Sequence, residues 1–133
     1  MAVTGPSGPI HILVVDDDDN HRRLAEILLQ GEGYSVGLAG TASQAIDSIA
    51  EQRPALIVLD LTLPDVHGLR LIERLRRDAP EIPVLVVTGD TTPDARIATL
   101  RAAEYLNKPY DIDALVDVVA RLVQNGNLDG RAE

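Results

Sequence analysis

The apolar positions of the chain fall into short unbroken runs that alternate with amphipathic segments. An aliphatic run without polar alternation is typical of a strand that is covered on both faces, as in a parallel sheet. Three runs have this character, at residues 10–15, 55–59 and 82–87. Residues 34–39 are interrupted by Ser and Gly and residues 105–107 are very short. We therefore predict that these two stretches form edge strands.

The segments between these strands carry apolar residues at helical spacing. We predict helices over residues 20–30, from residue 41 or 43 past residue 49, between residues 69 and 80, over about 93–102 and from 111 to about 123. The first helix is predicted to present Leu24, Ile27 and Leu28 on one face, with Asp19 or Asn20 as its N-cap. The last helix has a wide apolar face, which is either wholly buried or leaves surface for a partner.

Five strands that alternate with five helices predict a parallel sheet with right-handed crossovers and helices on both faces. The three fully apolar strands are expected at the centre, which gives the order 2-1-3-4-5 of a flavodoxin-like (βα)5 doubly wound sandwich. The ligand crevice of such a sheet lies at the carboxyl ends of its first and third strands. We predict one domain over residues 10–124, with flexible tails at residues 1–9 and 125–133.

Composition narrows the possible functions. The 133 residues include no Cys, which excludes disulfides, thiolate metal sites and Cys nucleophiles. A formal net charge of −9 argues against binding to a nucleic-acid backbone, which requires Lys and Arg. The sequence shows neither a membrane-spanning apolar run nor the layout of a signal peptide, so we expect a cytoplasmic protein.

Ionisable and hydroxyl side chains stand at the carboxyl ends of the predicted strands. Asp16 and Asp17 follow the first strand, and Asp60 ends the third. Thr88 ends the fourth strand, and Lys108 follows the fifth. Asp60 alone could be a turn former or a helix cap. Because parallel strands end at one edge of the sheet, all five side chains are expected to share one crevice.

This set of groups predicts phosphoryl chemistry. Three crowded carboxylates repel one another, so they require a cation or must take up protons. Oxygen ligands without Cys or His favour a hard ion, Mg²⁺ or, as a second possibility, Mn²⁺. A divalent ion, a Lys and a hydroxyl around one Asp can neutralise a phosphoryl group in transfer. Asp60 is therefore predicted to be a nucleophile that forms an aspartyl phosphate.

These residues resemble the receiver domains of bacterial two-component response regulators, over about residues 10–123. The matching motifs are Val14-Val15-Asp16-Asp17, Leu59-Asp60-Leu61-Thr62-Leu63-Pro64 with Gly68, Val86-Val87-Thr88-Gly89, and Tyr105-Leu106-Asn107-Lys108-Pro109. The resemblance implies a signalling domain rather than an enzyme, with a sensor histidine kinase or a histidine phosphotransfer protein as the phosphoryl donor.

The resemblance also implies a metal-ligand set. Asp17 and Asp60 would bind Mg²⁺ directly together with the Thr62 backbone carbonyl, and Asp16 would bind it through water. The side chains of Thr62 and Asp90 would flank the path of the water that releases the phosphoryl group.

The resemblance also implies which residues contact the phosphoryl group and which change position in response to it. Lys108 and Thr88 would contact it, and the Lys108–Pro109 bond would be cis. Movement of Thr88 would let Tyr105 rotate inward and change the surface of the fourth helix, fifth strand and fifth helix. An output partner or a homodimer is expected there. The chain ends within ten residues of the last predicted helix, so it is expected to be a stand-alone receiver or part of a larger regulator or hybrid kinase.

Two alternatives share parts of this pattern. A haloacid-dehalogenase-type phosphatase also uses Asp, Thr and Lys at strand ends, but it needs an acid two residues after the nucleophile, where this chain has Thr62. A flavodoxin-like FMN carrier shares the strand order, but the aspartates at residues 16–19 would repel its phosphate. His11, His21 and His67 lack metal-ligand spacing and are expected to have no catalytic role. The exposed face of the first helix, with Arg22 and Arg23, either meets the donor or is solvated.

Overall fold

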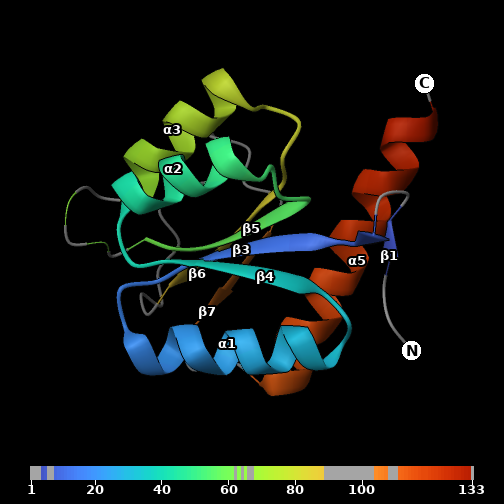
Figure 1. Cartoon of the computed structure of the whole chain (residues 1–133), viewed down its shortest axis with the longest axis horizontal. Helices are drawn as coiled ribbons and strands as arrows, with labels where there is room; N and C mark the ends of the chain where they lie inside the picture. The colour runs from blue at the N-terminus through green and yellow to red at the C-terminus, as the bar shows by residue number, and fades with distance from the viewer. Residues whose placement is uncertain are drawn as a thin grey trace.

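The computed structural model describes residues 4–5, 8–61, 63, 65, 68–88, 104–107 and 111–132. Figure 1 shows a central sheet between two layers of helices, with α2 and α3 on one face and α1 and α5 on the other. These helices span Asp19–Gly31 (α1), Ala42–Glu51 (α2), Gly68–Asp78 (α3) and Ile112–Ala132 (α5). The helix predicted at 93–102 lies outside the described residues.

The five-stranded sheet confirms the predicted order. Its strands are β3 (His11–Val15), β4 (Ser35–Ala39), β5 (Leu56–Asp60), β6 (Val84–Thr88) and β7 (Glu104–Asn107). They lie in the order β4-β3-β5-β6-β7, and every neighbouring pair is parallel. This is the predicted 2-1-3-4-5 order, with the two weaker strands at the edges.

Successive side chains of the central strands pack into two separate cores, because side chains alternate between the faces of a strand. Leu13, Ile57 and Leu59 pack with α2 and α3 on one side. Ile12 and Val14 pack with α1 and α5 on the other side. All residues of β5 are buried, so Asp60 stands at the end of a strand that is covered on both faces.

Helix α1 departs from the prediction in its cap and in its buried face. Asp18 is the N-cap, and its side chain accepts hydrogen bonds from the backbone N–H groups of residues 20 and 21. Ala25 and Leu29 are the residues of α1 that are buried against the sheet. Leu24 and Ile27 are 42% and 56% exposed, whereas Leu28 is partly buried and packs against the core, so the predicted apolar face is only partly covered. The spacing alone fitted two helical faces, and packing selected the face that carries the smaller Ala25.

The two ends of the chain contain regular structure where tails were expected. Residues Thr4–Gly5 (β1) and Gly8–Pro9 (β2) pair as two short antiparallel strands. Helix α5 continues to Ala132 instead of ending near Val123. The stretch after Val123 contains Gly but no Pro, and Gly weakens a helix without removing a backbone N–H group. The apolar face of α5 is mostly buried against the sheet, and Ile112 at its start is exposed.

Candidate functional site

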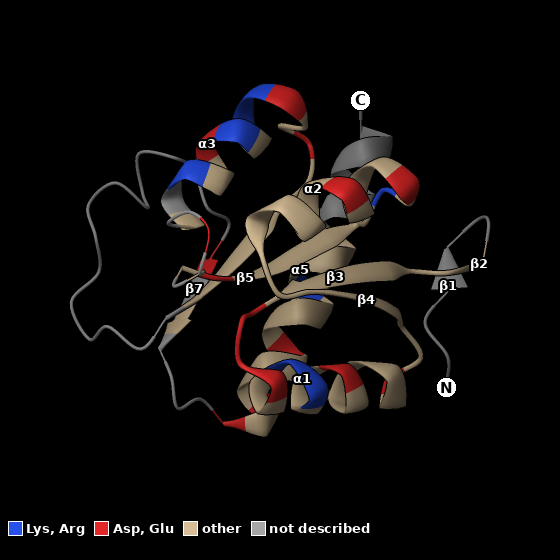
Figure 2. Cartoon of the chain, turned by 60° about the vertical axis from the view of Figure 1, so that its left-hand side comes forward, with Lys and Arg blue, Asp and Glu red and all other residues tan. Residues whose placement is uncertain are grey.

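Three carboxylates meet where β3 and β5 end. One ligand oxygen each from Asp16, Asp17 and Asp60 lies within 4.8 Å of the others. Asp16 and Asp60 are only 7% and 8% exposed, whereas Asp17 is exposed. The neighbouring strands place them together, since Val15 of β3 pairs with Leu59 of β5. Figure 2 shows acidic residues in the turn after β3 and at the end of β5.

The turn from β3 into α1 fixes the orientation of Asp16. Its backbone N–H donates to the Ala39 carbonyl of β4 at 3.0 Å. Its Oδ1 accepts a hydrogen bond from the backbone N–H of Asp18 at 2.9 Å. Asp18 then caps α1, so a single turn carries the chain from the strand into the helix. Within the acidic run at residues 16–19, Asp18 therefore caps the helix, and Asp16 belongs to the carboxylate cluster.

The loop that follows Asp60 is held at two points. The backbone N–H of Gly68 donates to the Leu61 carbonyl at 2.7 Å, which closes the loop on itself. A Cβ at Gly68 would lie 2.7 Å from the Leu61 Cα, so only glycine fits this close approach. At the other point, Asp65 accepts hydrogen bonds from the backbone N–H groups at the start of α2, both at 3.0 Å.

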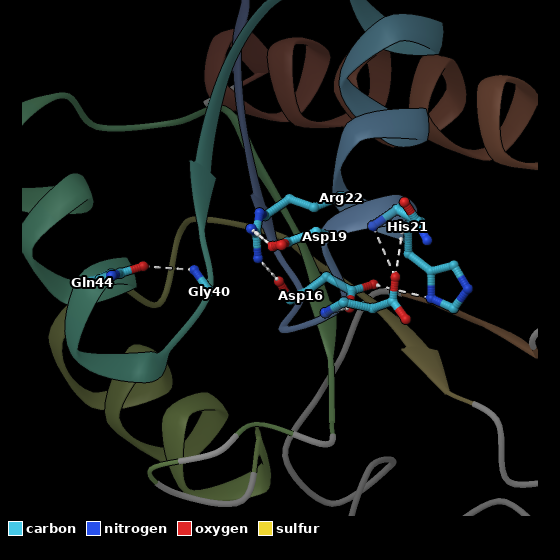
Figure 3. Close-up of polar contacts among 8 residues, drawn as sticks. Asp16, Asp19, His21, Arg22, Gly40 and Gln44 are labelled. Atoms are coloured by element: carbon cyan, nitrogen blue, oxygen red, sulfur yellow. Dashed lines mark hydrogen bonds and ion pairs between the residues drawn. The ribbon is translucent and has the colours of Figure 1, made fainter.

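The structure places two residues near Asp16 whose role at the site the sequence did not predict. The Nδ1 atom of His21 lies 3.9 Å from Asp16 Oδ2. Arg22 donates from Nη1 to the Asp16 backbone carbonyl at 2.6 Å (Figure 3). Both residues lie in the first turns of α1. The N-terminus of this helix, capped by Asp18, follows the end of β3 closely. Recognition of that cap was the sequence signal that could have located them.

The other predicted site residues are described only in part. Thr88 ends β6 and Tyr105 lies in β7, and their backbones are in register because Thr88 pairs with Asn107 and Val86 with Tyr105. Their side chains are outside the description. Thr62, Asp90, Lys108 and Pro109 lie outside the described residues. The described strands nevertheless end at one edge, where Asp60 pairs with Val87.

The chemistry of the carboxylate cluster fits a hard divalent cation. Burial of an ionised carboxylate is unfavourable unless a cation or hydrogen bonds compensate its charge. Two buried carboxylates and a third nearby supply a negative site with oxygen donors, the ligands that Mg²⁺ prefers. Asp16, Asp17 and Asp60 are the residues that would hold such an ion.

Comparison with known proteins supports this interpretation. The family model of the response regulator receiver domain matches residues 12–120. The probable transcriptional regulatory protein TcrX of Mycobacterium tuberculosis is 38% identical over 110 residues, which cover 81% of this chain and 47% of that protein. The response regulator MprA of Mycolicibacterium vanbaalenii is 36% identical over 126 residues, which cover 93% of this chain and 54% of that protein.

Solved structures show the same fold. A CheY-like response regulator receiver domain protein from Methanospirillum hungatei superposes with a TM-score of 0.87 at 26% identity, covering 92% of this chain and 99% of that chain. The chain spans about half the length of the curated relatives named above. Within the described ranges, none of the helices combines the length and apolarity needed to cross a membrane. The matches favour a receiver over a phosphatase, and the chain belongs to the receiver-domain family of two-component response regulators.

Proposed function

We propose that Asp60 accepts a phosphoryl group from a phosphohistidine, on a sensor histidine kinase or a histidine phosphotransfer protein. The observation that carries this proposal is the meeting of Asp16, Asp17 and Asp60 within 4.8 Å at the end of a fully buried strand. In the transfer, an oxygen of Asp60 attacks phosphorus while the phosphorus–nitrogen bond breaks. The imidazole leaves with the electron pair of that bond.

The residues around Asp60 have separate roles in this reaction. Mg²⁺, or Mn²⁺ in its place, supplies neutralising charge when bound. In this proposal Asp17 and Asp60 would hold it directly with the Thr62 carbonyl, and Asp16 would hold it through water. Asp60 is 8% exposed and ends a strand that is buried along its length, so we expect the donor to approach from the carboxyl edge of the sheet.

In this proposal Lys108 and Thr88 would contact the phosphoryl group, and the Lys108–Pro109 bond would be cis. The domain, residues 10–124, acts as a phosphoacceptor in signalling, and it promotes only its own phosphorylation and dephosphorylation. Asp90 and the Thr62 side chain tune that release.

The exposed apolar residues of α1 offer a docking surface for the donor. Leu24 and Ile27 are exposed on the helix that begins beside the carboxylates. Arg22 is engaged within the domain, whereas Arg23 is exposed. Replacing Ile27 by Asp should slow transfer from a phosphohistidine protein and leave labelling by acetyl phosphate unchanged. Equal slowing with both donors would contradict this docking surface.

A second surface would report the phosphoryl state. In this proposal Thr88 moves toward the phosphoryl group, Tyr105 rotates inward, and a partner or second copy meets the fourth helix, β7 and α5. The exposed Ile112 at the start of α5 supports such a contact. Beryllofluoride with Mg²⁺ should shift backbone amide resonances in β7 and α5. Shifts confined to the loops around Asp60 would contradict the switch.

Mass spectrometry tests the acceptor assignment. Acetyl phosphate with Mg²⁺ should add one phosphoryl group to the intact protein and none to Asp60→Asn. Asp47→Asn is a matched control, because Asp47 is an exposed carboxylate on α2, away from the cluster. Labelling of Asp60→Asn at the wild-type level, or labelling in EDTA, would overturn the proposal.

A further inference from the structure

The guanidinium of Arg22 lies where α1, β3 and β4 meet. Its Nη1 donates to the Asp16 backbone carbonyl at 2.6 Å, and its Nη2 pairs with the Asp19 carboxylate (Figure 3). The side chain of Arg22 is only 21% exposed. We propose that Arg22 is a positioning residue for the metal site, holding Asp16 in place, and that Gly40 provides the space its guanidinium occupies.

Asp16 is the point at which this contact acts on the site. Strand β3 ends at Val15, so the Asp16 carbonyl lies beyond the strand. The Asp16 N–H is fixed by the Ala39 carbonyl, and the Asp16 carbonyl is fixed by Arg22. These bonds hold the peptide groups on both sides of the Asp16 Cα and thereby orient its carboxylate. Because the carbonyl would lose a charge-assisted hydrogen bond, removal of Arg22 should let this segment shift.

Gly40 has a steric relationship to the same guanidinium. A Cβ built on Gly40 would lie 3.0 Å from Arg22 Nη1. Its backbone does not have a positive φ, so space rather than a dihedral angle favours glycine at this position. The Gly40 N–H donates to Gln44 Oε1 at 2.7 Å, which ties this backbone to α2. An added methyl group should therefore displace the guanidinium.

Position and charge predict opposite effects on metal affinity. Arg22 carries a positive charge near the carboxylates, so loss of that charge alone would strengthen binding of a divalent cation. Loss of the hydrogen bond to Asp16 would weaken binding, because the ligand is less well held. Gly40→Ala keeps the charge and disturbs only the position. The two substitutions together separate the two effects.

The test measures the Mg²⁺ dissociation constant by calorimetry or by the amide shift of Asp17. Arg22→Ala should weaken binding about tenfold, as is typical for loss of an outer-shell partner. Gly40→Ala should weaken it in the same direction but less. The double variant should bind as Arg22→Ala does, since the closest contact of the added methyl group is with the Arg22 guanidinium. Arg22→Lys should recover part of the affinity by restoring one donor.

The matched controls are Arg23→Ala, an exposed neighbour, and Gly31→Ala, where an added Cβ meets nothing within 4 Å. Neither should change Mg²⁺ affinity. Tighter binding by Arg22→Ala, or additive effects in the double variant, would overturn the positioning role. The inference rests on the proposed metal site. If the wild type does not bind Mg²⁺, both the proposed metal site and the role of Arg22 are wrong. If the wild type binds Mg²⁺ and the variants bind it with the same affinity, only the role of Arg22 is wrong.

Discussion

Asp65 lies across the N-terminus of α2, where its Oδ1 accepts a hydrogen bond from the backbone N–H of Ala42 at 3.0 Å. Its Oδ2 accepts a second from Ser43, also at 3.0 Å. The Thr41 hydroxyl accepts a hydrogen bond from another backbone N–H group of this helix, that of Gln44. The loop that follows the proposed acceptor thus supplies part of the cap of an earlier helix. Any movement of this loop is coupled to α2.

Asp65→Ala should lower the free energy of unfolding by about 1–2 kcal/mol, because it removes an anion that satisfies two N–H groups of a helix terminus. Asp65→Asn keeps one strong acceptor and should lose less. Urea unfolding measures both effects. Asp47→Ala, an exposed site within α2, is the control and should change stability little. Equal stability of Asp65→Ala and the wild type would show that the two hydrogen bonds contribute nothing.

Gly68→Ala should destabilise the protein and weaken Mg²⁺ binding together. The new Cβ would lie 2.7 Å from the Leu61 Cα and 3.1 Å from the Asp60 carbonyl oxygen, so the backbone after the acceptor must move. Overpacking of this kind costs about 1–3 kcal/mol. Gly31→Ala has free space and tests for a general effect of replacing glycine. If the Gly68→Ala variant is destabilised but binds Mg²⁺ with wild-type affinity, the position of this loop does not affect metal binding.

Asp17→Asn should change the stability of the protein in opposite directions without and with metal. Without metal it removes repulsion among three carboxylates and should raise stability. With Mg²⁺, the wild type should gain about 2.7 kcal/mol at a concentration 100 times its dissociation constant. The variant should lose most of that gain. Thermal unfolding in EDTA and over a range of Mg²⁺ concentrations measures both effects. A destabilised variant in EDTA would show that repulsion is not the dominant interaction of Asp17.

The strand order and the carboxylate cluster could be predicted because each depends on a short local pattern. Unbroken apolar runs identified the central strands, and parallel order then brought Asp16 and Asp60 to one edge. Contacts between distant segments could not be predicted in this way. The Asp65 cap joins residues more than twenty positions apart, and the Arg22 contact depends on the exact start of α1.

Errors in the predicted helices have a similar cause. Leu24 and Ile27 have the spacing of a core face, but the sheet is met by Ala25 and Leu29. A single residue of rotation separates these faces, and only packing distinguishes them. The end of α5 was placed near Val123 because the following residues are polar. Loss of apolar residues ends the burial of a helix face, but polar residues can still continue the helix, and the stretch after Val123 does.

His11 should make stability depend on pH. Its Nδ1 lies 2.9 Å from the Ser35 hydroxyl oxygen, and its ring packs over Gly37, where a Cβ would lie 3.2 Å from Nε2. Burial lowers the pKa of His11 below its ordinary value of 6.5, and a hydrogen bond with Ser35 opposes this only in part. The unfolded chain therefore takes up a proton at a higher pH than the folded protein does.

Stability should consequently fall as pH decreases through 6.5, and the loss should continue until the lowered pKa of folded His11 is reached. Above 6.5 the imidazole is neutral in both states and contributes no slope. His11→Gln removes this contribution while the carboxylates titrate as before. Urea unfolding between pH 7.5 and 5.5 should give a shallower loss for His11→Gln than for the wild type. Parallel curves would show that His11 takes up its proton equally in the folded and unfolded states.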